Sequence, residues 1–143
     1  MVNNKLGQWT LTLLRVYLGI LFIIHGYFKL FVKGALPGTA QFFSQIGIPA
    51  ANYAAVLVAF VEFVGGILLL LGLLTKWTTF VLLIEMLVAF FKVHLWQGFV
   101  IMQNKYGYEF ILLIIVGLIA LLVNGAGNLS LGKKLSKNKK YLH

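Results

Sequence analysis

Four long apolar stretches dominate the sequence and leave few folds open to the chain. They run from about residue 9 to 32, 51 to 74, 77 to 99 and 107 to 124, and each is close to the ~20 residues that cross a bilayer as a helix. Hydrophobic residues make up 61% of the chain and charged residues only 10%, against roughly 45–50% and about 25% in soluble domains. We therefore predict an all-α integral membrane protein, a four-helix bundle in a single domain over residues 1–143.

The lysines predict the orientation of this bundle. The basic tail, residues 125–143, carries five lysines, and with four spans it lies on the same side as Lys5 and Lys76. The opposite side holds Lys33 and Lys105, so the positive-inside rule predicts that both termini are cytoplasmic. The net charge of +9 fits contact with anionic lipid in the cell membrane of a prokaryote. Nucleic acid is not an expected partner, because the basic run is short and has no folded module around it.

Ionisable residues interrupt the apolar stretches. Arg15, His25 and Lys29 lie in the first span and, at about 100° per residue, share one stripe of the helix, which we expect to face inward. The chain has no aspartate, and its three glutamates all fall within expected spans: Glu62, Glu85 and Glu109. An acid at this depth costs about 2.5–3.5 kcal/mol on insertion scales and usually pairs with a base inside the bundle.

Expected depths assign these groups to two layers. The outer layer is a cluster of His25, Lys29, His94 and Glu109, and the inner layer is a structural ion pair between Arg15 and Glu62. Glu62 also shares a stripe with Ala55, Ala59 and Gly66, small residues that let another helix approach closely.

The third span presents a conflict. In a regular helix His94 lies about 180° from Glu85, so both side chains cannot point at the same bundle centre. Either a local distortion turns one of them, or Glu85 and Lys92 serve a contact between copies of the chain, with His94 facing the core.

The connector at residues 33–49 has two interpretations. Its Pro37-Gly38 pair, followed by Phe42 and Phe43, fits a turn and then a short interfacial helix over the outer end of the bundle. The alternative is a plain connector at the membrane surface.

Several short motifs resemble, in order and spacing, those of the DoxX family of small four-helix membrane proteins. They are R-x3-G-x5-HG-x2-KL from Arg15, GIP from Gly47, E-x2-GG-x5-GL from Glu62, H-x3-GF from His94, GYEF from Gly107 and GAGNLSL from Gly125. The resemblance implies a four-helix bundle and a link to respiratory redox chemistry through quinone oxidoreductase subunits. The polar positions of the family are matched by Arg15, His25, Lys29, Glu62, His94 and Glu109, whereas Glu85 and Lys92 lie outside its pattern.

The first functional hypothesis is a quinone-linked redox component or accessory subunit. A quinone needs an apolar aromatic slot, donors for its carbonyl oxygens and a group that titrates near neutral pH. His25 and His94 are the candidate donors or bases and Glu109 the candidate proton relay. The expected substrate-binding residues are Lys29, Glu62, Tyr27 and Phe91. The chain has no cysteine, so electron transfer would need a cofactor or a redox partner subunit.

Three alternatives stay open. The buried charges of a non-catalytic assembly or scaffold protein would only specify its packing. Two histidines on different helices would suit a haem or a metal ion, which we rank below a quinone because no helix carries an E-x-x-H pair. A transporter fits less well, because four short helices show no inverted repeat. Any of these proteins would contact lipid and is compatible with a homo-oligomer.

Overall fold

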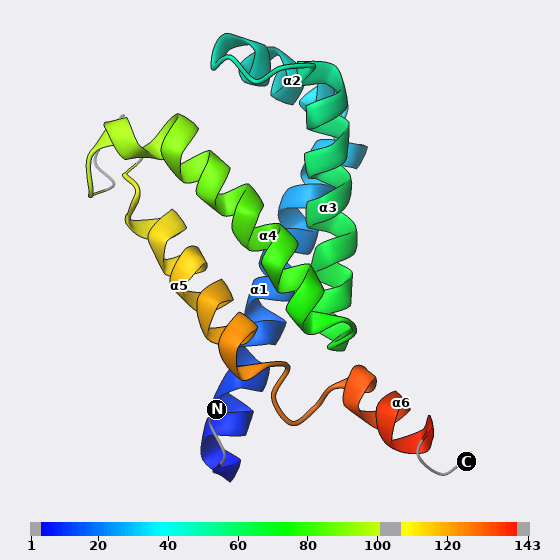
Figure 1. The fold of residues 1–143 in the computed structure, drawn as a ribbon. Coiled ribbons are helices and arrows are strands. Elements are labelled where there is room, and N and C mark those ends of the chain that lie inside the picture. Colours follow the sequence, from blue (N-terminus) through cyan, green and yellow to red (C-terminus); the bar gives the residue numbers. More distant parts are fainter. Residues whose placement is uncertain (1–3, 101–106, 140–143) are drawn as a thin grey trace.

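The computed structural model describes residues 4–100 and 107–139, and every regular element in these ranges is a helix (Figure 1). The α-helices are α1 (Lys5–Phe31), α2 (Ala35–Gln45), α3 (Ala51–Leu71), α4 (Thr75–Ala89), α5 (Glu109–Asn124) and α6 (Leu131–Lys139). Directly after α4 the chain forms a π-helix, η1 (Phe90–His94), and a 3₁₀ turn, η2 (Leu95–Gln97). The described residues thus confirm the all-α class.

Three of the described helical runs are long and apolar enough to cross a membrane: Lys5–Phe31, Ala51–Leu71 and Thr75–Gln97. The last run joins α4 to η1 and η2. The fourth expected span, residues 107–124, becomes α5, a shorter apolar helix of 16 residues. At about 1.5 Å per residue α5 is about 24 Å long, less than a hydrocarbon core of about 30 Å. Together these apolar helices make the chain an integral membrane protein in contact with lipid.

Helices α1 and α3 share the most extensive contact between any two described helices. Small residues bring them together: Ala55 and Ala59 are fully buried, and a Cβ atom added to Gly66 would lie 2.6 Å from the backbone nitrogen of Ile23. Side chains without bulk let two backbones approach to van der Waals distance, which is how helices associate in lipid. The small-residue stripe predicted on this helix is therefore confirmed.

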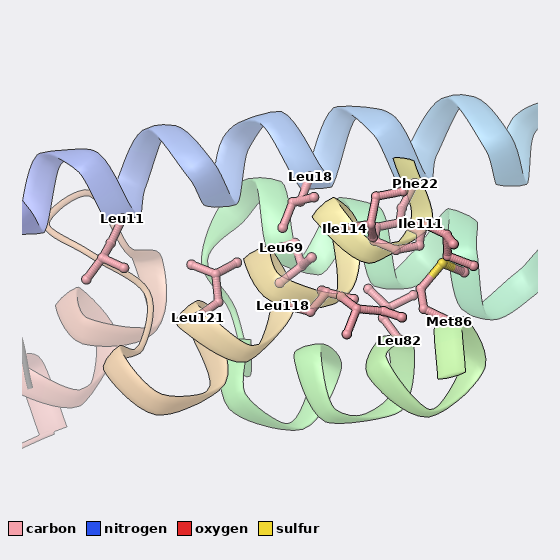
Figure 2. Packing of buried hydrophobic residues seen from close by; sticks show 11 residues of the cluster. Leu11, Leu18, Phe22, Leu69, Leu82, Met86, Ile111, Ile114, Leu118 and Leu121 are labelled. Carbon is pink, nitrogen blue, oxygen red and sulfur yellow. The ribbon is translucent and has the colours of Figure 1, made fainter. Parts of the chain in front are cut away.

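One apolar core joins the four long helices (Figure 2). Its most buried members, none more than 2% exposed, are Leu18 and Phe22 of α1, Leu69 of α3, Leu82 of α4, and Leu118 and Leu121 of α5. Outside this core, many large apolar side chains on the same helices are exposed. That distribution is expected for helices whose outer faces meet lipid.

The connector between α1 and α3 contains a helix, α2, rather than a plain linker. It begins at Ala35, so Pro37 lies in its first turn instead of in a turn before it. Proline is tolerated there because the first backbone N–H groups of a helix have no acceptor within it. Helix α2 packs against α3 and α1 and lies across the end of α3 (Figure 1).

Candidate functional site

Two histidines from helices far apart in the sequence line one cavity. His25 of α1, His94 of η1 and Glu62 of α3 are the ionisable groups in its wall, and Phe22 and Phe110 are its aromatic side chains. The volume is about 280 Å³, and the other lining residues are mostly aliphatic. We call it the histidine cavity. The two histidines thus line one cavity, as expected. The side chain of His25 is exposed, so it lies at the rim of the cavity rather than in its interior.

The π-helix resolves the conflict between Glu85 and His94. In a continuous α-helix the two side chains would point in opposite directions. The residues of η1 form i to i+5 hydrogen bonds, and this wider turn changes the direction of every side chain that follows. As a result Glu85 and His94 line one groove together, and His94 also reaches the histidine cavity. The sequence allowed either a local distortion of the helix or a contact between copies of the chain. The structure contains the local distortion.

The ring of His94 is held by a neighbour on the next turn. Its Nδ1 lies 3.0 Å from Oε1 of Gln97. Because an amide oxygen only accepts hydrogen bonds, Nδ1 of His94 is the donor in this contact, and Nε2 carries the lone pair whenever the ring is neutral. The lone pair at Nε2 then makes His94 a candidate proton acceptor. Gln97 was not expected as a site residue from the sequence, since its position opposite the ring depends on the 3₁₀ turn.

Lys29 and Glu62 form an ion pair between α1 and α3, in which Nζ of Lys29 donates to Oε2 of Glu62. The side chains are 22% and 6% exposed, respectively. This pairing corrects the predicted ion pair between Arg15 and Glu62. The register of the two helices explains the difference, because α1 packs against α3 with Gly26 facing Phe63, which places Glu62 beside Lys29.

Arg15 is 1% exposed and uses its guanidinium on backbone carbonyls instead. Nε donates to the carbonyl of Ala126 at 2.9 Å and Nη1 to that of Leu70 at 2.8 Å. Further hydrogen bonds run from Nη1 to Leu69 and from Nη2 to Leu129. One side chain thereby joins α1 to the end of α3 and to the loop between α5 and α6. Its role is structural, as expected, but with different partners.

The same loop closes the end of α3. Gly72 follows the helix with a positive φ of 69°, and its carbonyl accepts from Oγ of Ser130 at 2.8 Å and from the backbone N–H of Gly132 at 3.2 Å. A Cβ atom on Gly72 would lie 2.8 Å from Nη1 of Arg15. Two of the quoted motifs, E-x2-GG-x5-GL and GAGNLSL, thus meet at this point. Their glycines serve packing.

Besides Lys29, three expected site residues lie outside the wall of the histidine cavity. Glu109 is the first residue of α5, next to the lining residue Phe110, but it does not line the histidine cavity itself. Tyr27 is 51% exposed with its ring against Phe31, and Phe91 is 59% exposed. The aromatic rings that line the cavity are those of Phe22 and Phe110.

Glu85 lies beside the ion pair and was not expected in the site. Its Oε2 atom is buried and has no hydrogen-bond partner among the described residues. It lines a second hollow of about 430 Å³, together with Lys29, Glu62 and His94. We call this hollow the α3–α4 groove. Its remaining walls come mostly from apolar residues of α2, α3 and α4.

The fold and these buried polar groups define a small α-helical membrane protein with an ionisable centre between its helices. The family model described as DoxX matches residues 10–95, which is more than half of the chain. The chain belongs to the DoxX family, as its motifs indicated.

Bacterial relatives extend over nearly the whole chain. One, from Bacillus subtilis, bears the name "Putative oxidoreductase CatD" and is 34% identical, covering 96% of this chain and 95% of its own. An uncharacterized membrane protein of Mycobacterium tuberculosis is 36% identical over 92% of this chain and 84% of its own. A Haemophilus influenzae protein is 33% identical over 95% and 99%, respectively. No solved structure matches the chain.

Proposed function

We propose that this DoxX family protein is a quinone-linked redox component or accessory subunit, with the histidine cavity as its quinone site. One observation carries the proposal: His25 and His94, from helices distant in the sequence, line the same largely apolar cavity beside Phe22 and Phe110. A quinone ring requires apolar walls with a few convergent polar groups. The name of the B. subtilis relative agrees with a redox role, although it names no quinone.

The lining residues suggest how protons would move. Histidine titrates near neutral pH, so His25 and His94 can donate to a carbonyl oxygen and pass on a proton. Glu62 lines the same cavity, whereas Glu109 does not. Within this proposal Glu62 is therefore better placed than Glu109 for the role of proton relay. The electrons would come from a partner subunit or a separate cofactor.

We expect His25→Phe to weaken the binding of an oxidised quinone analogue, such as a decyl benzoquinone, and to leave the protein folded. His25 is exposed at the rim of the cavity, so a ring of similar size is accommodated while the donor is lost. Losing one good hydrogen bond weakens affinity by about tenfold, since about 1.4 kcal/mol is tenfold in Kd. Titration of purified wild type and variant by calorimetry, with a thermal unfolding curve for each, measures both quantities.

Tyr27→Phe is the matched control, because Tyr27 is on the same helix and outside the cavity wall. It should bind the analogue as wild type does. A stable wild-type protein that binds no quinone analogue would refute a site formed by this chain alone.

A non-catalytic assembly protein is the second candidate. The observation in its favour is that Arg15 and the Lys29–Glu62 pair are satisfied by groups of the protein itself. In that case His25→Phe lowers the thermal unfolding midpoint, and there is no ligand binding to lose. The same two measurements therefore separate the two candidates.

We further propose four spans, α1, α3, α4 with its continuation, and α5, in one domain with both termini in the cytoplasm. Lys133 of α6 donates to Oε1 of Gln8 at 3.4 Å, so the two ends of the chain lie together, and Lys5 and Lys76 are at the same end (Figure 1). The lysines gathered at this end of the bundle support its placement on the cytoplasmic side of the membrane. A fusion of alkaline phosphatase after His143 should be inactive in a bacterial host; an active fusion would reject this topology.

The membrane in question, on this proposal, is the plasma membrane of a prokaryote, because the relatives reported above are bacterial. A redox partner subunit or a second copy of the chain would meet the apolar outer faces of the helices.

A further inference from the structure

The α3–α4 groove is the larger of the two hollows that reach the ionisable centre. Helices α3 and α4 meet at the turn between them and diverge from there, so that they form a V beneath α2 (Figure 1). The groove of about 430 Å³ lies within this V. Its walls include Leu57, Ile84 and Val88, which are each exposed. An apolar molecule in the bilayer therefore has lateral access to it.

The polar end of the groove holds one cation and two acids. Lys29 donates to Oε2 of Glu62, and Glu85 lines the same groove. Oε2 of Glu85 is buried without a partner. A buried polar atom left unpaired costs roughly 1–3 kcal/mol, so this oxygen marks a place where a hydrogen-bonding group is missing.

The chemistry of the carboxyl group determines what the missing group must be. Glu62 is already paired with the cation Lys29, and Glu85 lines the same groove. A carboxylate oxygen only accepts hydrogen bonds. The missing group is therefore a donor.

We propose that the α3–α4 groove binds an amphipathic molecule whose hydroxyl group donates to Oε2 of Glu85 and whose apolar body lies between α3 and α4. An aromatic diol with an alkyl tail, as in the hydroquinones, meets these requirements. The choice of a hydroquinone among amphipathic molecules with a hydroxyl group rests on the proposed function. The oxidised ring would occupy the histidine cavity and the diol the groove. Glu62 and His94 line both hollows and connect them.

A neutral hydroxyl fits the charges better than a hydrophobic cation does. The groove is also lined by Lys29 and Lys92, whose positive charges repel an ammonium or phosphonium group. The walls supply apolar contact for an alkyl tail.

The test compares decylhydroquinone with its bis-methyl ether, which has nearly the same shape and no donor. Wild-type protein should bind the hydroquinone about tenfold more tightly than the ether, the value of one buried hydrogen bond. Glu85→Leu removes the acceptor and should abolish this preference. Glu85→Gln should retain it, because the amide oxygen still accepts a hydrogen bond. Binding is measured by calorimetry in detergent.

Val88→Trp provides a test that leaves all the acids in place. Val88 is 47% exposed and lines the groove, so a larger ring there fills the space without disturbing the core. This variant should lose hydroquinone binding and keep the folded state, which matters if Glu85→Leu does not fold.

Three results would overturn the inference. The first is equal affinity of wild type for the hydroquinone and its ether. The second is that Glu85→Gln loses the preference for the hydroquinone as fully as Glu85→Leu does and that the wild-type protein binds decylammonium, which would identify a cation site. The third is unchanged hydroquinone binding in Val88→Trp. The His25→Phe variant separates the two sites, since it should lose the oxidised analogue but retain the diol.

Discussion

Arg15→Met is expected to lower the free energy of unfolding by about 3–5 kcal/mol, the cost of removing one partner from a buried charged contact. The guanidinium is 1% exposed and donates to carbonyls at the end of α3 and in the loop after α5. Methionine fills much of the space but donates nothing, so several buried carbonyls lose their donors. The expected result is a lower thermal unfolding midpoint and a smaller folded fraction in size-exclusion chromatography.

Two variants serve as controls. Arg15→Lys keeps the charge but cannot reproduce a planar fork that reaches separate carbonyls, so we expect an intermediate loss of stability. Leu13→Met changes a side chain that is 71% exposed on the same helix, and it should leave the unfolding midpoint unchanged. An Arg15→Lys protein as stable as wild type would show that charge alone, rather than the carbonyl contacts, holds this region.

Arg15 and Glu62 should also behave independently. They share no partner, since Arg15 is bonded to carbonyls and Glu62 to Lys29. Changes at sites without shared partners usually add within a few tenths of a kcal/mol. The double variant Arg15→Met with Glu62→Gln should therefore lose the sum of the two single losses. A clear recovery in the double variant would favour the direct ion pair that depth alone predicted.

The class and the helix order follow from local sequence, because a run of apolar residues long enough for a bilayer has few alternatives as a helix. The stripe of small residues around Gly66 likewise indicated a close helix contact. The register of that contact was not predictable from estimated depths. An error of one or two turns in a guessed helix end is enough to exchange Lys29 for Arg15 as the partner of Glu62.

The site was predictable in its residue types and less so in its geometry. The pairing of His25 with His94 follows from their depth, but their common cavity depends on the π-helix at Phe90–His94. No pattern in the sequence marked this distortion except the conflict between Glu85 and His94. Glu109 was placed by depth alone, and depth does not say which way the first side chain of a helix points.

Helix α1 supplies a cation to each of the two polar layers. Arg15 closes the end of the bundle where the termini lie, and Lys29 neutralises the acid that lines both hollows. The two cations therefore have different consequences. Loss of Arg15 disturbs the fold, whereas loss of Lys29 also changes the charge of the proposed sites.

Lys29→Met is accordingly expected to destabilise the protein by about 3–5 kcal/mol, because it leaves the carboxylate of Glu62 buried beside Glu85 without a cation. Glu62→Gln in the same chain should restore most of the loss, since an amide needs no counter-charge and can donate to Glu85. Thermal unfolding of wild type, both single variants and the double variant completes the cycle.

The coupling energy between Lys29→Met and Glu62→Gln shows whether the two residues act as a pair. A Lys29–Glu62 pair that acts as one unit gives a coupling energy of roughly 0.5–3 kcal/mol, so that the double variant is more stable than the sum of the single losses predicts. Lys33→Met is the control, because Lys33 is exposed one turn beyond Lys29 and should leave the midpoint unchanged. Strict additivity of Lys29→Met and Glu62→Gln would mean that Glu62 finds its counter-charge elsewhere. The polar end of the α3–α4 groove would then not depend on the ion pair between Lys29 and Glu62.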